Sequence, residues 1–125
     1  MMIIRSALLA AAFLTTACVA PPAPVETAAA AGGCDLKVDF ASIGTGIDSA
    51  TLQKVDTLLS GDTGISTIDR QRWGKEGEIT LCIATRTEAD ATRLFGSVKR
   101  LFPASSAKPI SVETAAGQLF RVPTP

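Results

Sequence analysis

The chain has no histidine and no tyrosine among its 125 residues, and it contains a single tryptophan. Histidine is the commonest general base near neutral pH and the commonest zinc ligand, so its absence removes the usual routes to acid–base catalysis and to a zinc site. Charge of one sign is not in excess, because 12 Lys and Arg balance 12 Asp and Glu. A nucleic-acid-binding protein needs a concentrated basic surface. We therefore predict a protein without enzymatic activity, without a metal or other cofactor, and without a nucleic-acid partner.

An apolar run over residues 7–14 follows a start that carries one positive charge, Arg5. The run is far shorter than the about 20 residues of a transmembrane helix, and the arrangement is typical of an export signal. Residues 14–18 read Leu-Thr-Thr-Ala-Cys and resemble the lipobox of bacterial lipoproteins, although Thr15 stands where that family usually has leucine. The resemblance implies a lipoprotein-type signal peptide over residues 1–17 and a lipid on Cys18. Export without lipidation and a retained membrane anchor are the alternatives.

Residues 19–33 are rich in proline and alanine and end in two glycines. This composition is typical of a disordered linker, so residues 18–33 would join the lipid anchor to a folded domain over residues 34–125. Val19 is not the aspartate that signals inner-membrane retention in enteric-type lipoproteins, so the resemblance implies the outer membrane, with the domain facing the periplasm. The whole chain is also similar to small uncharacterised exported proteins of alphaproteobacterial type, a likeness that implies no activity.

The chain has two further cysteines, Cys34 and Cys82. Export would deliver them to an oxidising compartment, where a disulfide persists. Neither belongs to a Cys-x-x-Cys pair, so a thioredoxin-type redox site is not indicated. We predict a bridge between them, which would stabilise the fold by roughly 4 kcal/mol because it closes a loop of about 50 residues. Two free thiols are the alternative. Cys82 is out of phase with Leu81 and Ile83, so the bridge requires Cys34 to lie just outside its strand.

The periodicity of the domain predicts six main elements. Strands are expected at 34–43, 64–73, 76–85 and 110–114, and helices between Asp48 and Gly61 and from Thr87 to before Pro103. A turn at residues 116–117 predicts an extra strand over 118–122, which would double back as a C-terminal hairpin. The order β-α-β-β-α-β resembles the ferredoxin-like α+β sandwich, an antiparallel sheet with two helices on one face. That resemblance implies that the first and third strands are central neighbours.

The stretch Arg70, Arg72, Trp73 and Lys75 is the candidate contact surface. Residues 64–73 are polar, as an edge strand should be, and their charges deter sheet-to-sheet aggregation. The alternative is a surface on which a partner docks with Trp73 as anchor, since tryptophan and arginine are enriched at such contacts. Trp73 could equally cover an open end of the core.

Two further groups of residues bear on catalysis or ligand binding. The loop 42–48, with glycines at 44 and 46, precedes a helix N-terminus, a place that can hold an anion. It carries a second hypothesis, a small-ligand-binding protein or an enzyme. Glu76 and Glu78, two apart, would share a face of a strand, yet nothing near them in the sequence would shift their pKa values towards catalysis.

We favour a non-enzymatic envelope lipoprotein whose disulfide-linked domain docks onto another envelope protein or the cell wall. Residues 82–102 and the strand that follows resemble the peptidoglycan-binding SPOR repeat, but they lack that family's Gly–small–Phe at the end of the first strand. The resemblance implies peptidoglycan as one of the possible partners.

Overall fold

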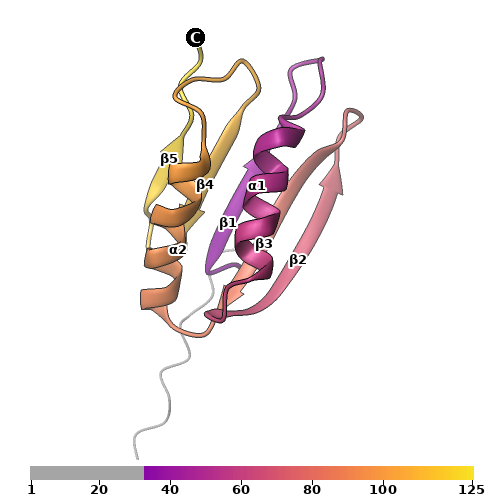
Figure 1. Ribbon diagram of the computed structural model, residues 1–125. Coiled ribbons are helices and arrows are strands. Elements are labelled where there is room, and N and C mark those ends of the chain that lie inside the picture. Colours follow the sequence, from indigo (N-terminus) through magenta and orange to yellow (C-terminus); the bar gives the residue numbers. More distant parts are fainter. Residues whose placement is uncertain (1–32) are drawn as a thin grey trace, which may run out of the picture.

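The computed structural model describes residues 33–125, which form a five-stranded antiparallel sheet covered on one face by two helices (Figure 1). The elements in chain order are β1 (Leu36–Phe40), α1 (Ser49–Ser60), β2 (Ile65–Trp73), β3 (Glu78–Thr85), α2 (Glu88–Leu101), β4 (Ile110–Thr114) and β5 (Leu119–Arg121). In space the strands run β2-β3-β1-β4-β5. This is the expected ferredoxin-like sandwich with its extra hairpin strand. The predicted signal peptide, Cys18 and the linker up to residue 32 lie outside the described residues.

The two faces of the sheet differ in chemistry because side chains alternate along each strand. In β1, Leu36, Val38 and Phe40 are fully buried towards the helices, and each lies opposite an apolar residue of β3. Lys37 and Asp39 point to the other face, which no helix covers (Figure 1). We call this second face the open face.

The core lies between the sheet and the helices. Its buried members are Leu36, Val38, Phe40, Val55, Leu59, Ile79, Leu81, Ile83, Leu94, Val98, Ile110, Val112 and Val122. The helix positions among them, Val55 with Leu59 and Leu94 with Val98, recur at four-residue spacing, which gives each helix one apolar stripe. Phe102 packs between Phe40 and Phe120, with ring centroids 6.5 and 6.3 Å apart, so the short strand β5 is joined to the same core.

Local hydrogen bonds confirm where the helices were expected to begin. Asp48 Oδ1 accepts from the Thr51 N–H at 3.0 Å, and Thr87 Oγ accepts from the Asp90 N–H at 3.1 Å. Each cap binds an N–H group that has no partner inside the helix. Gly61 follows the last residue of α1, as predicted.

A disulfide joins Cys34 to Cys82, with the two Cα atoms 5.1 Å apart. Cys82 lies on the open face, out of phase with its core-facing neighbours. Cys34 precedes the first residue of β1 by two positions, so the alternation of β1 does not dictate where its side chain points. The predicted bridge and its geometric condition are both confirmed.

Three connecting segments meet at one end of the sandwich, which we call the distal end. They are the loop 41–48, the β2–β3 turn at 74–77 and the segment 102–109. Figure 1 shows this end opposite the point where β1 begins. Hydrogen bonds join these segments; for example, Ser42 Oγ donates to Glu76 Oε2 at 2.6 Å, and Lys108 Nζ donates to the Ile47 carbonyl at 3.1 Å.

Candidate functional site

The four residues of the candidate contact surface do not share a face. β2 is an edge strand, as predicted. Its Arg70 and Arg72 lie opposite Leu81 and Ile79 of β3, and therefore on the side of the helices. Trp73 is on the opposite side, and Lys75 is in the turn beyond the strand. The alternation of a strand already separates Arg72 from Trp73, so this split could have been read from the sequence.

Trp73 extends over the open face and is 47% exposed, so it does not cover an end of the core. Its Nε1 donates to Thr80 Oγ at 3.1 Å, and Thr80 donates in turn to Asp39 Oδ1 at 2.5 Å. The expectation that Trp73 could close the core is therefore wrong. Its indole is held by a polar contact on a face that water reaches.

The contact continues across the open face from strand to strand. Lys37 Nζ lies 3.5 Å from Asp39 Oδ2 and 2.8 Å from Glu113 Oε1. The hydrogen bond with Glu113 raises the pKa of Lys37, although partial burial opposes the rise. The open face thus carries a polar network that links β2, β3, β1 and β4.

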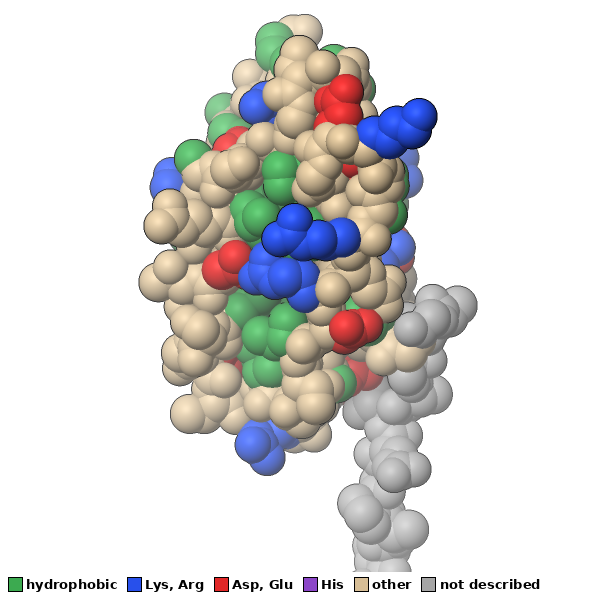
Figure 2. Space-filling view, turned by 90° about the vertical axis from the view of Figure 1, so that its right-hand side faces the viewer, with side chains coloured by type: hydrophobic (Ala, Val, Ile, Leu, Met, Phe, Trp, Pro, Cys, Tyr) green, Lys and Arg blue, Asp and Glu red, His purple; other side chains and the backbone are tan. Residues whose placement is uncertain are grey.

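The two arginines on the helix side of β2 differ in their contacts. The Arg70 guanidinium forms an ion pair with Asp56 of α1. The Arg72 side chain has no hydrogen bond or ion pair within residues 33–125. Figure 2, which looks at the flank formed by β2 and α1, shows basic side chains across its middle, with hydrophobic side chains above and below them.

Next to Arg72 the distal end is hollowed. The cavity measures about 490 Å³ and lies between the loop 41–48, the first turn of α1, the hairpin and the segment 102–109. We call it the distal hollow. Its charged lining residues are Arg70, Arg72, Glu76 and Lys108, and its apolar ones include Ile47, Leu52 and Ile79.

The glycine loop at residues 44–46 already holds a carboxylate, that of Glu76. Glu76 Oε2 accepts from the Ser42 hydroxyl at 2.6 Å and from the Gly46 N–H at 3.1 Å. The Ser42 bond and then the Gly46 bond lower the pKa of Glu76. Gly44 and Gly46 have φ values of 114° and 77°, which favour glycine. The anion expected at this loop is therefore part of the chain itself.

Glu76 and Glu78 do not share a strand face. Glu76 lies in the turn, and β3 begins only at Glu78, so the expectation from their spacing is wrong. The Glu78 side chain is buried and accepts from the Glu76 N–H at 2.8 Å. Each carboxylate thus holds a backbone amide of the distal end. Within the described part of the chain, no group of three metal-ligating side chains is present.

Sequence reasoning missed the contacts that build the distal hollow. Ser42 and Glu76 are 34 positions apart, and Lys108 and Ile47 are 61 apart. Neither pair belongs to a motif, so only the glycines of the loop pointed to this region. Asp35 was also missed: it is buried, and its Oδ2 accepts from the Thr85 N–H at 2.8 Å, which ties the start of β1 to the end of β3.

No protein-family model, curated protein or solved structure matches the chain. Within residues 33–125, neither helix has the length and apolar character needed to cross a bilayer. Lipidation at Cys18 and the identity of a partner remain predictions from the sequence.

Proposed function

We propose that the chain is an exported lipoprotein, anchored through a lipid on Cys18 to the outer membrane and facing the periplasm. Its disulfide-linked domain has no enzymatic role. It docks onto another component of the envelope, a protein or the cell wall. The observation that carries this proposal is the Leu-Thr-Thr-Ala-Cys sequence at residues 14–18, directly after a short apolar run and before a proline- and alanine-rich segment.

The position of the distal end, opposite the start of the described chain, supports the proposal. The described chain enters the sandwich beside β1, and the distal end lies on the opposite side (Figure 1). A domain tethered at its N-terminus would therefore present the distal hollow away from the membrane. The bridge between Cys34 and Cys82 agrees with an oxidising compartment, where such a bond is stable.

Metabolic labelling with palmitate in a Gram-negative host tests the anchor. We expect label on the wild-type chain and none on the Cys18→Ser variant, because the thiol that receives the lipid is absent. Cys34→Ser is the matched control: it also replaces a cysteine by serine, and it should keep the label. Density-gradient separation of the membranes should place the labelled chain in the outer membrane. Equal labelling of the wild-type chain and the Cys18→Ser variant would contradict the proposal.

A second candidate function is the binding of a small anion in the distal hollow. The volume of about 490 Å³ favours it, as does the guanidinium of Arg72, which is unpaired among residues 33–125. Against it, the donors of the glycine loop are occupied by Glu76. Titration of the purified chain with glutarate would detect this activity.

A further inference from the structure

We propose that the free edge of β2 binds an extended, acidic segment of a partner protein as an additional strand, whose carboxylates face Arg72 and Lys108 in the distal hollow. This inference rests on the proposed docking function and names the surface and the chemistry of the partner.

The first support is the edge itself. β2 ends the sheet, and eight of its nine residues are exposed. An edge strand presents unpaired backbone N–H and C=O groups, which a second extended chain can satisfy. Ile68, on the helix side of β2, is 41% exposed, so the helices leave this flank uncovered. Figures 1 and 2 show β2 at the margin of the sheet, beyond α1, with hydrophobic and basic side chains in the open.

The second support is the balance of charge on the helix side of that edge. Three cations, Arg70, Arg72 and Lys108, line the distal hollow. The nearby carboxylates are already engaged: Asp56 pairs with Arg70, and Glu76 accepts from Ser42 and Gly46. Asp48, which interacts electrostatically with Lys108, accepts from the Thr51 N–H and hydroxyl at the start of α1. The positive charges of Arg72 and Lys108 therefore have no carboxylate bound to them within residues 33–125. An incoming acidic group would complement them.

The geometry of a strand brings these two features together. A chain added to β2 would lie about 4.8 Å from it and would turn every second side chain towards the helices. Those side chains would pass over Ile68, Arg70 and Arg72, which alternate along β2 on this side. Acidic residues at alternate positions would thus meet the cations, while the backbone of the segment pairs with the edge.

A second copy of the chain is a poorer occupant of the edge. Two β2 strands that pair antiparallel about their centre place Asp69 opposite Asp69, and a shift of the register in one direction places Arg70 opposite Arg70. The shift in the other direction places Ile68 opposite Ile68, but it offers Arg72 no carboxylate, because Arg72 then lies beyond the first residue of the other strand. Like charges directly opposite destabilise a sheet. The charges that deter self-association leave the edge available to a strand of a different sequence.

Calorimetric titration of the full chain, purified in detergent, tests the inference. The probe is an end-blocked peptide of nine residues, the length of β2, in which glutamate alternates with valine. We expect saturable binding of one peptide per chain, and none of the peptide with lysine in place of glutamate. Arg72→Glu should weaken binding about tenfold or more, because it reverses the charge that faces the peptide. Arg121→Glu makes the same charge change on β5 and should leave the affinity within about twofold.

A version of the acidic peptide that is N-methylated at every residue keeps its carboxylates but has no backbone donors, and it should not bind. Three results would overturn the inference: equal binding of the N-methylated peptide, glutarate binding as tightly as the peptide, or no binding of the acidic peptide. An Arg72-dependent dimer in sedimentation would also overturn it, since a second copy would then occupy the edge. The titration does not depend on lipid. Palmitate label on Cys18 together with no binding of the acidic peptide would therefore contradict only the inference about β2. An unlabelled chain that binds the peptide contradicts the proposed anchor instead.

Discussion

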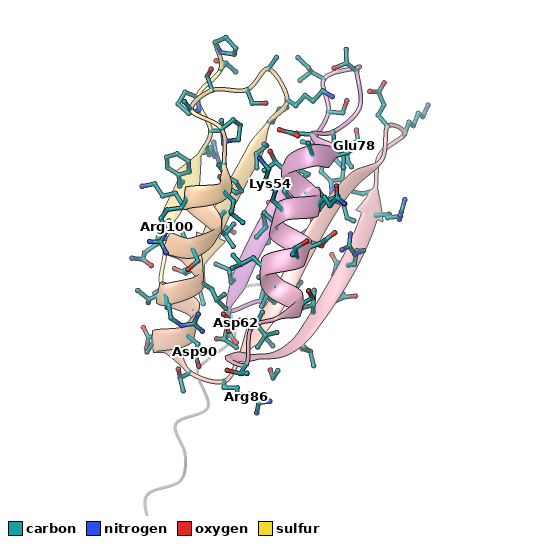
Figure 3. All side chains as sticks on the ribbon, in the orientation of Figure 1. Lys54, Asp62, Glu78, Arg86, Asp90 and Arg100 are labelled. Atoms are coloured by element: carbon teal, nitrogen blue, oxygen red, sulfur yellow. A yellow bond between two sulfur atoms is a disulfide. The ribbon has the colours of Figure 1, made fainter. Side chains whose placement is uncertain are left out.

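Asp62, just after α1, accepts several hydrogen bonds that no sequence pattern predicted. Both of its oxygens accept from the Arg93 guanidinium, at 2.7 and 2.8 Å, and Oδ1 also accepts from the Gly64 N–H at 2.8 Å. The Arg93 bonds, followed by the Gly64 bond, lower the pKa of Asp62 to about 2. Figure 3 shows Asp62 at the same end of the sandwich as Asp90, which also binds Arg93, so this cluster ties the α1–β2 loop to α2.

We expect Asp62→Asn to lower the free energy of unfolding at pH 7 by about 1 kcal/mol, a modest value because Arg93 is half exposed to screening solvent. The folded-state pKa lies below the unfolded one, so the carboxylate stabilises fully above about pH 4 and loses this effect as the pH falls towards about 2. Urea unfolding of the wild type and the variant at pH 7 and at pH 2 measures this difference in unfolding free energy. Asp69→Asn is the control, because within residues 33–125 the Asp69 carboxylate accepts from Gln71 Nε2 and forms no ion pair. A loss that is as large at pH 2 as at pH 7 would contradict the assignment.

At the scale of elements, the β2–β3 hairpin depends on the backbone of its turn. Gly74 has a φ of +66°, a backbone conformation that residues with a side chain rarely adopt. A Cβ there would also collide with the Glu78 carboxylate. That carboxylate is already fixed by the Glu76 N–H. The turn therefore has two independent reasons for glycine at this position.

Gly74→Ala should destabilise the domain by about 2–3 kcal/mol, because it adds a collision to the cost of the backbone conformation. Gly117→Ala is the matched control: its φ is +94°, but no atom lies within 4 Å of the added Cβ. It should cost only about 1 kcal/mol. Thermal unfolding of the two variants separates the terms, and equal losses would show that the contact with Glu78 is unimportant.

For the molecule as a whole, the disulfide joins the first described residues to a central strand. Cys34 and Cys82 are 48 positions apart, so reduction frees a long loop in the unfolded chain. Cys82 belongs to β3, which also carries the buried core residues Ile79, Leu81 and Ile83, and Cys34 lies two positions before β1. Loss of the bridge should weaken folding without changing the sheet order.

The double variant Cys34→Ser/Cys82→Ser should lose roughly 4 kcal/mol of unfolding free energy in the chain-entropy model. Urea titration of the wild type with and without reductant provides the comparison, since reduction should shift its midpoint nearly as far as the double variant does. The reductant should leave the double variant unchanged. A wild-type midpoint that does not respond to reductant would mean that the bridge does not contribute to stability.

Most of the fold could be predicted from the sequence because the signals are local. Alternation in β1, the caps Asp48 and Thr87, and the glycines beside the hairpin each act within a few residues. With the chain order they were enough to indicate the ferredoxin-like sandwich. The same alternation would also have placed Trp73 and Arg72 on opposite faces.

The tertiary structure alone decided the site. The bond of Ser42 to Glu76, the contact of Lys108 with the Ile47 carbonyl and the unpaired state of Arg72 depend on segments that meet only after the sheet has formed. No local pattern encodes such contacts, because their energy depends on the packing of distant elements. The sequence by itself thus determined the elements and their order, and the packing of the sandwich determined which charges were neutralised and which were left to face the solvent.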